Sequence, residues 1–217
     1  MQCGDGSSLQ VTEPDEEQQS SLAYRERFKA KVARAREVEH ECIVPTLGFA
    51  EDAGKLYLVE PNAEGASLAE LSQAEQALDA DAVLEVGLQV ARALGELHRN
   101  GLVHGWVRPG AILVTEDRAL LRGCGLENPQ GEETGQPEFM SPEQLSEGRS
   151  LRPESDFFSL GAALFAAVVG RPPFRGETPG EIADAIRQGR PTFPGRGEPK
   201  FSKNVAFLFA KLLAADH

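Results

Sequence analysis

The chain has 217 residues, of which 41% are hydrophobic and 26% charged, a balance typical of a globular protein rather than a disordered one. Its 34 acidic and 22 basic residues give a formal charge of −12, which argues against nucleic acid as a partner. The three cysteines, Cys3, Cys42 and Cys124, are too few and too far apart for a disulfide framework or a CxxC metal pair. No apolar run predicts a membrane span, so we expect a cytoplasmic protein.

The first part of the chain predicts one helix and a hairpin. Apolar residues at Phe28, Val32, Ala35 and Val38 recur at helical spacing, which predicts an amphipathic helix over residues 22–39. Residues 44–50 and 56–60 then predict two short strands around a turn at residues 51–54. This part is therefore mixed in secondary structure.

The remainder of the chain predicts mostly helix. Ser67 and Glu70 have the spacing of a capping box, and apolar residues between 83 and 97 line one face of a longer helix. A proline directly after Ser141 and after Thr178 predicts two more helix starts. Residues 157–169 are apolar almost all round, which predicts a helix buried on every side.

Four segments in this order resemble the protein kinase family, especially bacterial serine/threonine kinases of the eukaryotic-like type. They are residues 56–68 (LYLVEPNAEGASL), 101–113 (GLVHGWVRPGAIL), 135–145 (GQPEFMSPEQL), and 155–161 with 170–174 (SDFFSLG and GRPPF). The resemblance implies an α+β fold of two lobes, with a reduced N-lobe sheet and a mostly helical C-lobe. Residues 1–7 would be a flexible tail, 8–61 the N-lobe, 62–66 the hinge and 67–217 a C-lobe without the family's last helix.

The resemblance also shows how the family's chemical positions are filled. Family kinases use a strand lysine, a helix glutamate, a catalytic aspartate and two Mg²⁺ ligands to transfer a phosphoryl group. In this sequence those five positions are vacated, being occupied by Thr12, Lys31, Trp106, Ala111 and Gly123. An indole cannot accept a proton, and neither alanine nor glycine offers a metal ligand.

Other matched positions suggest structural roles or weak nucleotide contacts. Asp156 corresponds to a buried scaffold acid, His104 to an apolar-spine residue, and Glu143 to an acid whose usual arginine partner would lie beyond residue 217. The residues that remain as candidates for contacting a nucleotide are Lys31, Glu60, Ala63 and Arg108. Glu60 would repel a polyanionic nucleotide or be costly to bury.

These positions lead to an expectation and two alternatives. We expect a catalytically inactive, kinase-like domain, not an enzyme, that binds a protein partner such as an active kinase or another signalling protein. No metal and no cofactor are expected, although ATP is possible. The first alternative is a divergent ATP-binding serine/threonine protein kinase or another nucleotide-dependent transferase, in which Lys31 and Arg108 hold phosphates. The second is a truncated remnant of a kinase domain.

Overall fold

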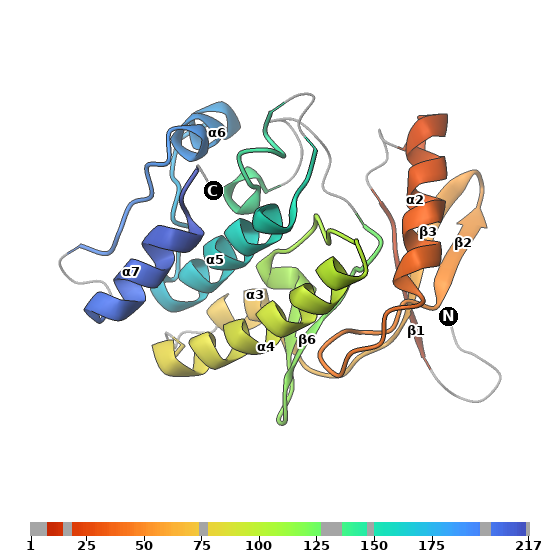
Figure 1. Ribbon diagram of the computed structural model, residues 1–217, viewed down its shortest axis with the longest axis horizontal. Helices are drawn as coiled ribbons and strands as arrows, with labels where there is room; N and C mark the ends of the chain where they lie inside the picture. Colours follow the sequence, from red (N-terminus) through yellow and green to blue (C-terminus); the bar gives the residue numbers. More distant parts are fainter. Residues whose placement is uncertain are drawn as a thin grey trace.

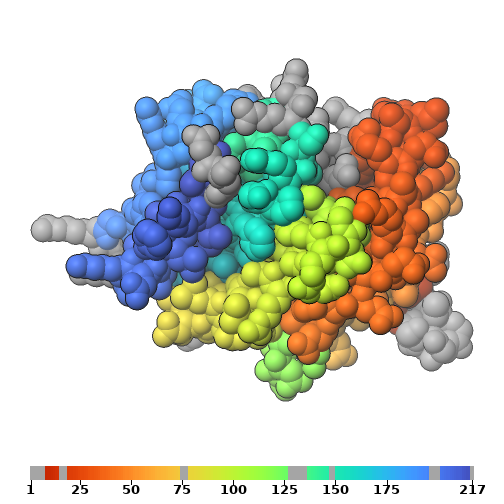
Figure 2. Space-filling view, viewed as in Figure 1, coloured from red at the N-terminus to blue at the C-terminus, as the bar shows by residue number. Residues whose placement is uncertain are grey.

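The computed structural model describes residues 8–14, 19–73, 78–126, 136–146, 150–195 and 201–215. Figure 1 shows a smaller part, built from a sheet and helix α2, beside a larger part made mostly of helices. In the space-filling view the orange N-terminal part lies directly against the yellow-green segment that follows it (Figure 2). The expected α+β, two-lobe fold is confirmed. The tail at residues 1–7 lies outside the described residues.

The N-lobe holds a three-stranded antiparallel sheet in the order β1-β3-β2. Its strands are β1 (Leu9–Thr12), β2 (Gly48–Asp52) and β3 (Lys55–Pro61). Leu56 and Leu58 of β3 are fully buried and pack with Phe28 and Val32 of helix α2 (Leu22–Ala35). Because strand side chains alternate between faces, Glu60 falls on the same buried face as Leu56 and Leu58.

Two expected boundaries in the N-lobe are wrong for the same physical reason. Helix α2 ends at Ala35, yet Val38 is only 5% exposed because it packs into the C-lobe core. The strand expected over residues 44–50 begins at Gly48, because the preceding residues pair with the other lobe. Val44 N donates to Leu121 O, and Leu121 N donates to Cys42 O. Both apolar patterns therefore reflect burial between the lobes.

The C-lobe is built around two long helices that pack against each other. They are α4 (Ala80–Arg99) and α5 (Pro153–Val169), and α5 is buried along almost its whole length, as expected. A second small sheet holds β4 (Ala66–Ser67), β5 (Ile112–Val114) and β6 (Ala119–Leu121). The remaining helices are α3 (Leu68–Gln73), α6 (Pro179–Arg187) and α7 (Lys203–Leu212).

The capping signals are confirmed at two of three places. Glu70 Oε2 accepts from Ser67 N, and Glu70 N donates to Ser67 Oγ, which closes the box ahead of α3. Thr178 caps α6 by accepting from Glu181 N. At Ser141 the expected helix is absent from residues 141–146, which form turns. There the Gln144 side chain accepts from Ser141 N and donates to Gly105 O, so it serves the loop rather than a helix.

Candidate functional site

The loop at residues 102–108, between α4 and β5, is held by a carboxylate from the first turn of α5. Asp156, which is 1% exposed, accepts from His104 N at 2.8 Å and from Gly105 N at 2.7 Å. His98 Nε2 of α4 lies 2.7 Å from the same carboxylate. A buried carboxylate with several donors forms short, charge-assisted hydrogen bonds. The backbone of the loop is therefore fixed by a helix about fifty residues further along the chain.

His104 is the residue through which this loop contacts the strand beneath it. Its Nδ1 accepts from Trp106 N and its Nε2 lies 3.1 Å from Arg122 O, an arrangement that suits a neutral ring protonated at Nε2. Burial lowers the pKa of His104 to about 4, in spite of the opposing charge of Asp156. The ring therefore stays neutral at pH 7, and its two hydrogen bonds join the loop to the residue that follows β6.

Trp106 and Arg108 are stacked at the position where family kinases carry the catalytic aspartate and the following lysine. The Arg108 guanidinium carbon lies 3.8 Å from the centre of the indole, which is a cation–π contact. Trp106 packs against a buried cluster that joins Phe28 of the N-lobe to Leu126 of the C-lobe. Its indole can only donate a hydrogen bond, so Trp106 offers no base to a substrate hydroxyl.

Neither of the two positions that would bind magnesium carries a ligand. Ala111 is fully buried and has only a methyl group, and Gly123 has no side chain. A β-carbon on Gly123 would lie 2.7 Å from Trp106 Cε3, so the site has no room for a side chain there. Across the described ranges, no three His, Cys, Asp or Glu residues come together as a metal site. The residues present at this site do not fit a magnesium ion.

Glu60 approaches Gly123 from the N-lobe side. Its carboxylate is 2% exposed and accepts from Gly123 N at 2.8 Å. Burial raises the pKa of Glu60 to about 7, although hydrogen bonds from Gly123 and Cys124 and the charge of Arg122 oppose the shift. The segment at residues 123–125 is therefore tied to β3 through a side chain, whereas family kinases place a metal-binding aspartate at residue 123.

Arg122 is the residue that the sequence reasoning missed. It follows β6, and its Nη1 donates to Gln10 Oε1 of β1 at 2.9 Å, which links the two lobes. Burial lowers the pKa of Arg108, and the positive charge of Arg122 lowers it further, so the two guanidinium groups act on each other. The sequence signal was an arginine directly after an apolar strand and before Gly123-Cys124-Gly125.

Arg108 has an unsatisfied donor. Its Nε is buried and has no hydrogen-bond partner among the residues that the structure describes. Arg108 also borders a groove of about 450 Å³ between α3, residues 136–139 and the end of α5. Glu138 and Arg171 carry the other charges along this groove. A buried guanidinium N–H beside an open groove is suited to an anionic ligand.

Lys31 contacts the same loop through backbone carbonyl groups. Its Nζ donates to His104 O and to Leu126 O, both at 2.7 Å, so α2 is tied to the C-lobe backbone. Thr12 lies in β1 opposite Leu58, and Ala63 lies between β3 and β4. No hydrogen bond joins Thr12 or Ala63 to residues 102–108 in the described part. The expected set thus divides into Arg108 at the groove and Lys31 in the backbone scaffold.

Glu143 has a partner, which corrects the expectation that it had lost one. Arg152 Nη2 lies 2.8 Å from Glu143 Oε1, and this pair joins residues 141–146 to the start of α5. The hydrogen bond from Arg152 lowers the pKa of Glu143 against the effect of burial. The family's arginine partner was expected beyond residue 217, whereas Glu143 pairs with an arginine only nine residues further along the chain.

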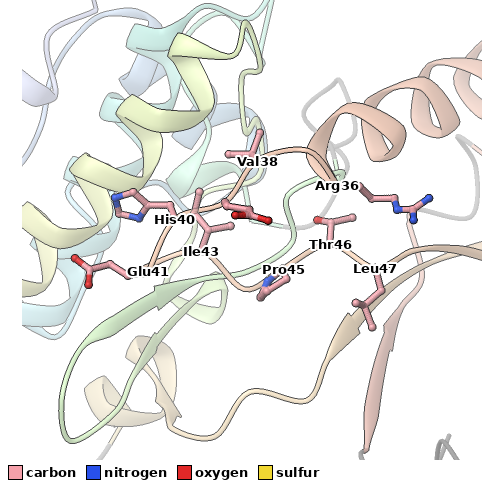
Figure 3. A pocket seen from close by; sticks show the side chains of 9 residues that line it. Arg36, Val38, His40, Glu41, Ile43, Pro45, Thr46 and Leu47 are labelled. Atoms are coloured by element: carbon pink, nitrogen blue, oxygen red, sulfur yellow. The ribbon is translucent and has the colours of Figure 1, made fainter.

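A second hollow lies between the end of α2 and β2 (Figure 3). It measures about 670 Å³ and is bordered by Val38, Ile43 and Pro45 together with the charged side chains Arg36 and Glu41. None of the residues that match the family's chemical positions borders it. We therefore place the candidate site at Trp106, Arg108 and Arg122 rather than here.

The fold and the arrangement of the loop define a protein kinase domain. The family model described as "Protein kinase domain" matches residues 11–217, so this chain belongs to the protein kinase family. It is of the bacterial, eukaryotic-like type, because the curated proteins that it resembles are bacterial serine/threonine kinases.

Three of these relatives give the extent of the similarity. The chain is 33% identical over 180 residues to serine/threonine-protein kinase AfsK of Streptomyces coelicolor, which covers 79% of this chain and 22% of AfsK. It is 31% identical over 211 residues to PksC of the same organism (88% and 38%). It is 27% identical over 202 residues to PknB of Mycobacterium leprae (87% and 32%). The chain therefore spans less than two fifths of each of these relatives.

The expectation that this chain is not an enzyme is contradicted by these findings. The family is that of protein kinase domains, and the relatives carry the name serine/threonine-protein kinase. Loss of the motif side chains does not by itself mean loss of the reaction, because charge and positioning can come from other residues. Family members typically use ATP and Mg²⁺.

In the part of the chain that the structure describes, no helix is long and apolar enough to cross a bilayer.

Proposed function

We propose that this chain is a divergent serine/threonine protein kinase domain of low turnover, which transfers a phosphoryl group from a nucleoside triphosphate to a protein hydroxyl. The observation that supports this most is the family match over residues 11–217. The Asp156 hydrogen bonds to the loop at His104 and Gly105 add to it, because they hold the backbone of the reacting segment in place. We expect the domain to act in the cytoplasm, where ATP is the common phosphoryl donor.

The protein substrate is best accommodated in the groove beside Arg108. The groove lies against residues 136–139 and α3, and its volume of about 450 Å³ suits a few residues of an extended peptide. Its partner is then a protein with a serine or threonine side chain, for example another kinase or signalling protein. Arg108 borders this groove, so its guanidinium would contact the phosphoryl group that is transferred.

The expected turnover follows from what is missing. Family kinases turn over at about 1–100 per second, and a general base contributes roughly 10²–10⁴-fold to such a rate. With Trp106 in place of the base, water must take the proton of the acceptor hydroxyl. Starting from the lower end of the family range, about 1 per second, the loss of the base leaves an expected turnover of about 10⁻⁴ to 10⁻² per second, which is below that range. Positioning of the loop by Asp156 and the charge of Arg108 would supply the remaining catalysis.

The test is transfer of radiolabelled γ-phosphate from ATP to casein and to the chain itself, in the presence of Mg²⁺. The parent chain is compared with Arg108→Ala and with Arg118→Ala, an exposed arginine in the turn between β5 and β6. We expect the parent and Arg118→Ala to label the acceptor equally and Arg108→Ala to label it at least tenfold less. Equal labelling by all three would identify a contaminating kinase, and labelling at background by the parent would also overturn the proposal.

A further inference from the structure

We propose that this chain binds the phosphates of its nucleotide with two arginine side chains, Arg108 and Arg122, and that this binding needs no divalent cation. The inference rests on the proposed function only in taking a nucleoside triphosphate as the ligand. It goes further in assigning the residues that hold the ligand and in excluding a requirement for metal.

Arg108 is the first of the two proposed phosphate ligands. Its Nε is buried and has no hydrogen-bond partner among the residues that the structure describes. A buried donor left unpaired lowers the stability of the protein, so a ligand oxygen that accepts a hydrogen bond from the guanidinium removes a cost already present. The guanidinium carbon lies 3.8 Å from the centre of the Trp106 ring. This cation–π contact holds the guanidinium at the ring before any ligand arrives.

Arg122 is the second of the two proposed phosphate ligands. Its Nη1 donates to Gln10 at 2.9 Å, and no carboxylate oxygen in the described ranges lies within ion-pair distance of its guanidinium. The charge of Arg122 acts on two acids, Glu60 and Glu70, but the Glu60 carboxylate already accepts from Gly123 N and the Glu70 carboxylate from Ser67 N. Two guanidinium groups whose positive charges act on each other, and which form no ion pair in the described ranges, are stabilised by an anion placed between them.

The absence of a requirement for metal follows from the neighbouring residues. In family kinases magnesium neutralises the phosphates and is held by an asparagine and an aspartate. Here those positions are Ala111, which is fully buried, and Gly123, where a β-carbon would lie 2.7 Å from Trp106 Cε3. Arginine pairs bidentately with phosphate oxygens and remains charged at every relevant pH. Two such groups provide the positive charge that a bound magnesium ion provides in family kinases.

The test is isothermal titration of the purified chain with ATP, inorganic tripolyphosphate and adenosine, each in excess EDTA and again in Mg²⁺. We expect ATP and tripolyphosphate to bind in EDTA, and adenosine to bind at least tenfold more weakly than ATP. Adding Mg²⁺ should tighten ATP binding by less than about threefold. Arg108→Ala and Arg122→Ala should each weaken binding at least tenfold, which is about 1.4 kcal/mol. Arg118→Ala should bind as the parent does.

Two further variants keep the test decisive if an alanine variant unfolds. Arg108→Lys and Arg122→Lys retain the charge and lose the fork, so they should weaken binding severalfold while leaving the thermal midpoint close to that of the parent. A requirement for Mg²⁺, or affinity in EDTA that none of the arginine variants changes, would overturn the inference. Binding of adenosine as tight as that of ATP would also overturn it, because the phosphates would then contribute nothing.

The two proposals can fail separately. Transfer of labelled phosphate in Mg²⁺, without binding of ATP in EDTA, would leave the proposed kinase function in place and overturn the proposal that two arginines bind the phosphates. Binding in EDTA that depends on both arginines, without label transfer from ATP, would do the reverse. No binding of ATP or tripolyphosphate up to millimolar concentration, in either condition, would overturn the inference.

Discussion

The indole of Trp106 occupies the space that a side chain at Gly123 would need. A β-carbon built on Gly123 lies 2.7 Å from Trp106 Cε3 and 2.8 Å from Cζ3. The backbone of Gly123 also has a φ of +85°, which favours glycine. The tryptophan at the position of the catalytic base and the missing metal ligand are therefore physically coupled, because a larger residue at 123 cannot coexist with the indole.

This coupling predicts non-additive stability effects. We expect Gly123→Ala to lower the free energy of unfolding by about 2–4 kcal/mol, through backbone strain and the clash with the indole. In a Trp106→Ala background the same change should cost only about 1 kcal/mol, because the strain in φ remains but the clash does not. Urea denaturation of the four proteins measures the difference as a coupling energy. Additive effects within about 0.5 kcal/mol would contradict the coupling.

Glu60 predicts a specific dependence of stability on pH. Burial raises its pKa from 4.5 to about 7, so protonation favours the folded state. This contribution is fully present below pH 4.5 and is lost as the pH rises through about 7. Glu60→Gln should therefore match the parent near pH 4 and exceed it above pH 7, by up to about 3 kcal/mol.

Chemical denaturation of both proteins between pH 4 and pH 8.5 measures this difference. His104, whose pKa is lowered, changes stability in the opposite direction, but it is common to both proteins and cancels. Glu64→Gln, at an exposed acid between β3 and β4, is the matched control and should follow the parent at every pH. A constant difference between Glu60→Gln and the parent across this range would refute the explanation.

Lys31 links α2 to the C-lobe, and we expect removal of its ammonium group to lower stability. Lys31→Met keeps the alkyl chain and removes the donors to His104 O and Leu126 O, leaving two carbonyls to be satisfied by other means. We expect a loss of about 2–3 kcal/mol in the free energy of unfolding, since hydrogen bonds to charged groups contribute about 1.5–3 kcal/mol. Amide hydrogen exchange in α2 should accelerate.

Lys29→Met is the matched control for this change. It lies on the same helix, 3.8 Å from Glu51 in a surface ion pair that is partly exposed. Such pairs contribute about 0–1 kcal/mol, so the control should be close to the parent. Equal losses in both variants would show that the two carbonyl contacts of Lys31 carry no special weight.

Asp156 predicts that loop order depends on a single carboxylate. In Asp156→Asn one oxygen becomes an amide that cannot accept from both His104 N and Gly105 N while facing His98. We expect the free energy of unfolding to fall by about 3 kcal/mol and amide exchange at residues 104 and 105 to accelerate. Glu154→Gln, exposed in the same first turn of α5, should leave both measurements unchanged. Unaltered exchange at 104 and 105 in Asp156→Asn would contradict this role.

The sequence by itself determined the elements that depend on local rules. The capping box at Ser67 and Glu70 closes between residues three apart, and the burial of α5 follows from an apolar surface on all sides. The spacing of four motifs likewise indicated the family and its two-lobe fold, because matching segments in order carry the same topology. These signals involve neighbours along the chain or a pattern preserved over its length.

Only the tertiary structure decided which side chains meet. The sequence offered Lys31 as a phosphate ligand, but its ammonium donates to carbonyls 73 and 95 residues away. It offered Glu143 without a partner, and the turn before α5 brings Arg152 to it. It indicated no role for Arg122, whose charge acts on Arg108 only in the folded chain. Long side chains reach through space, and periodicity and spacing record only which face of an element a residue occupies.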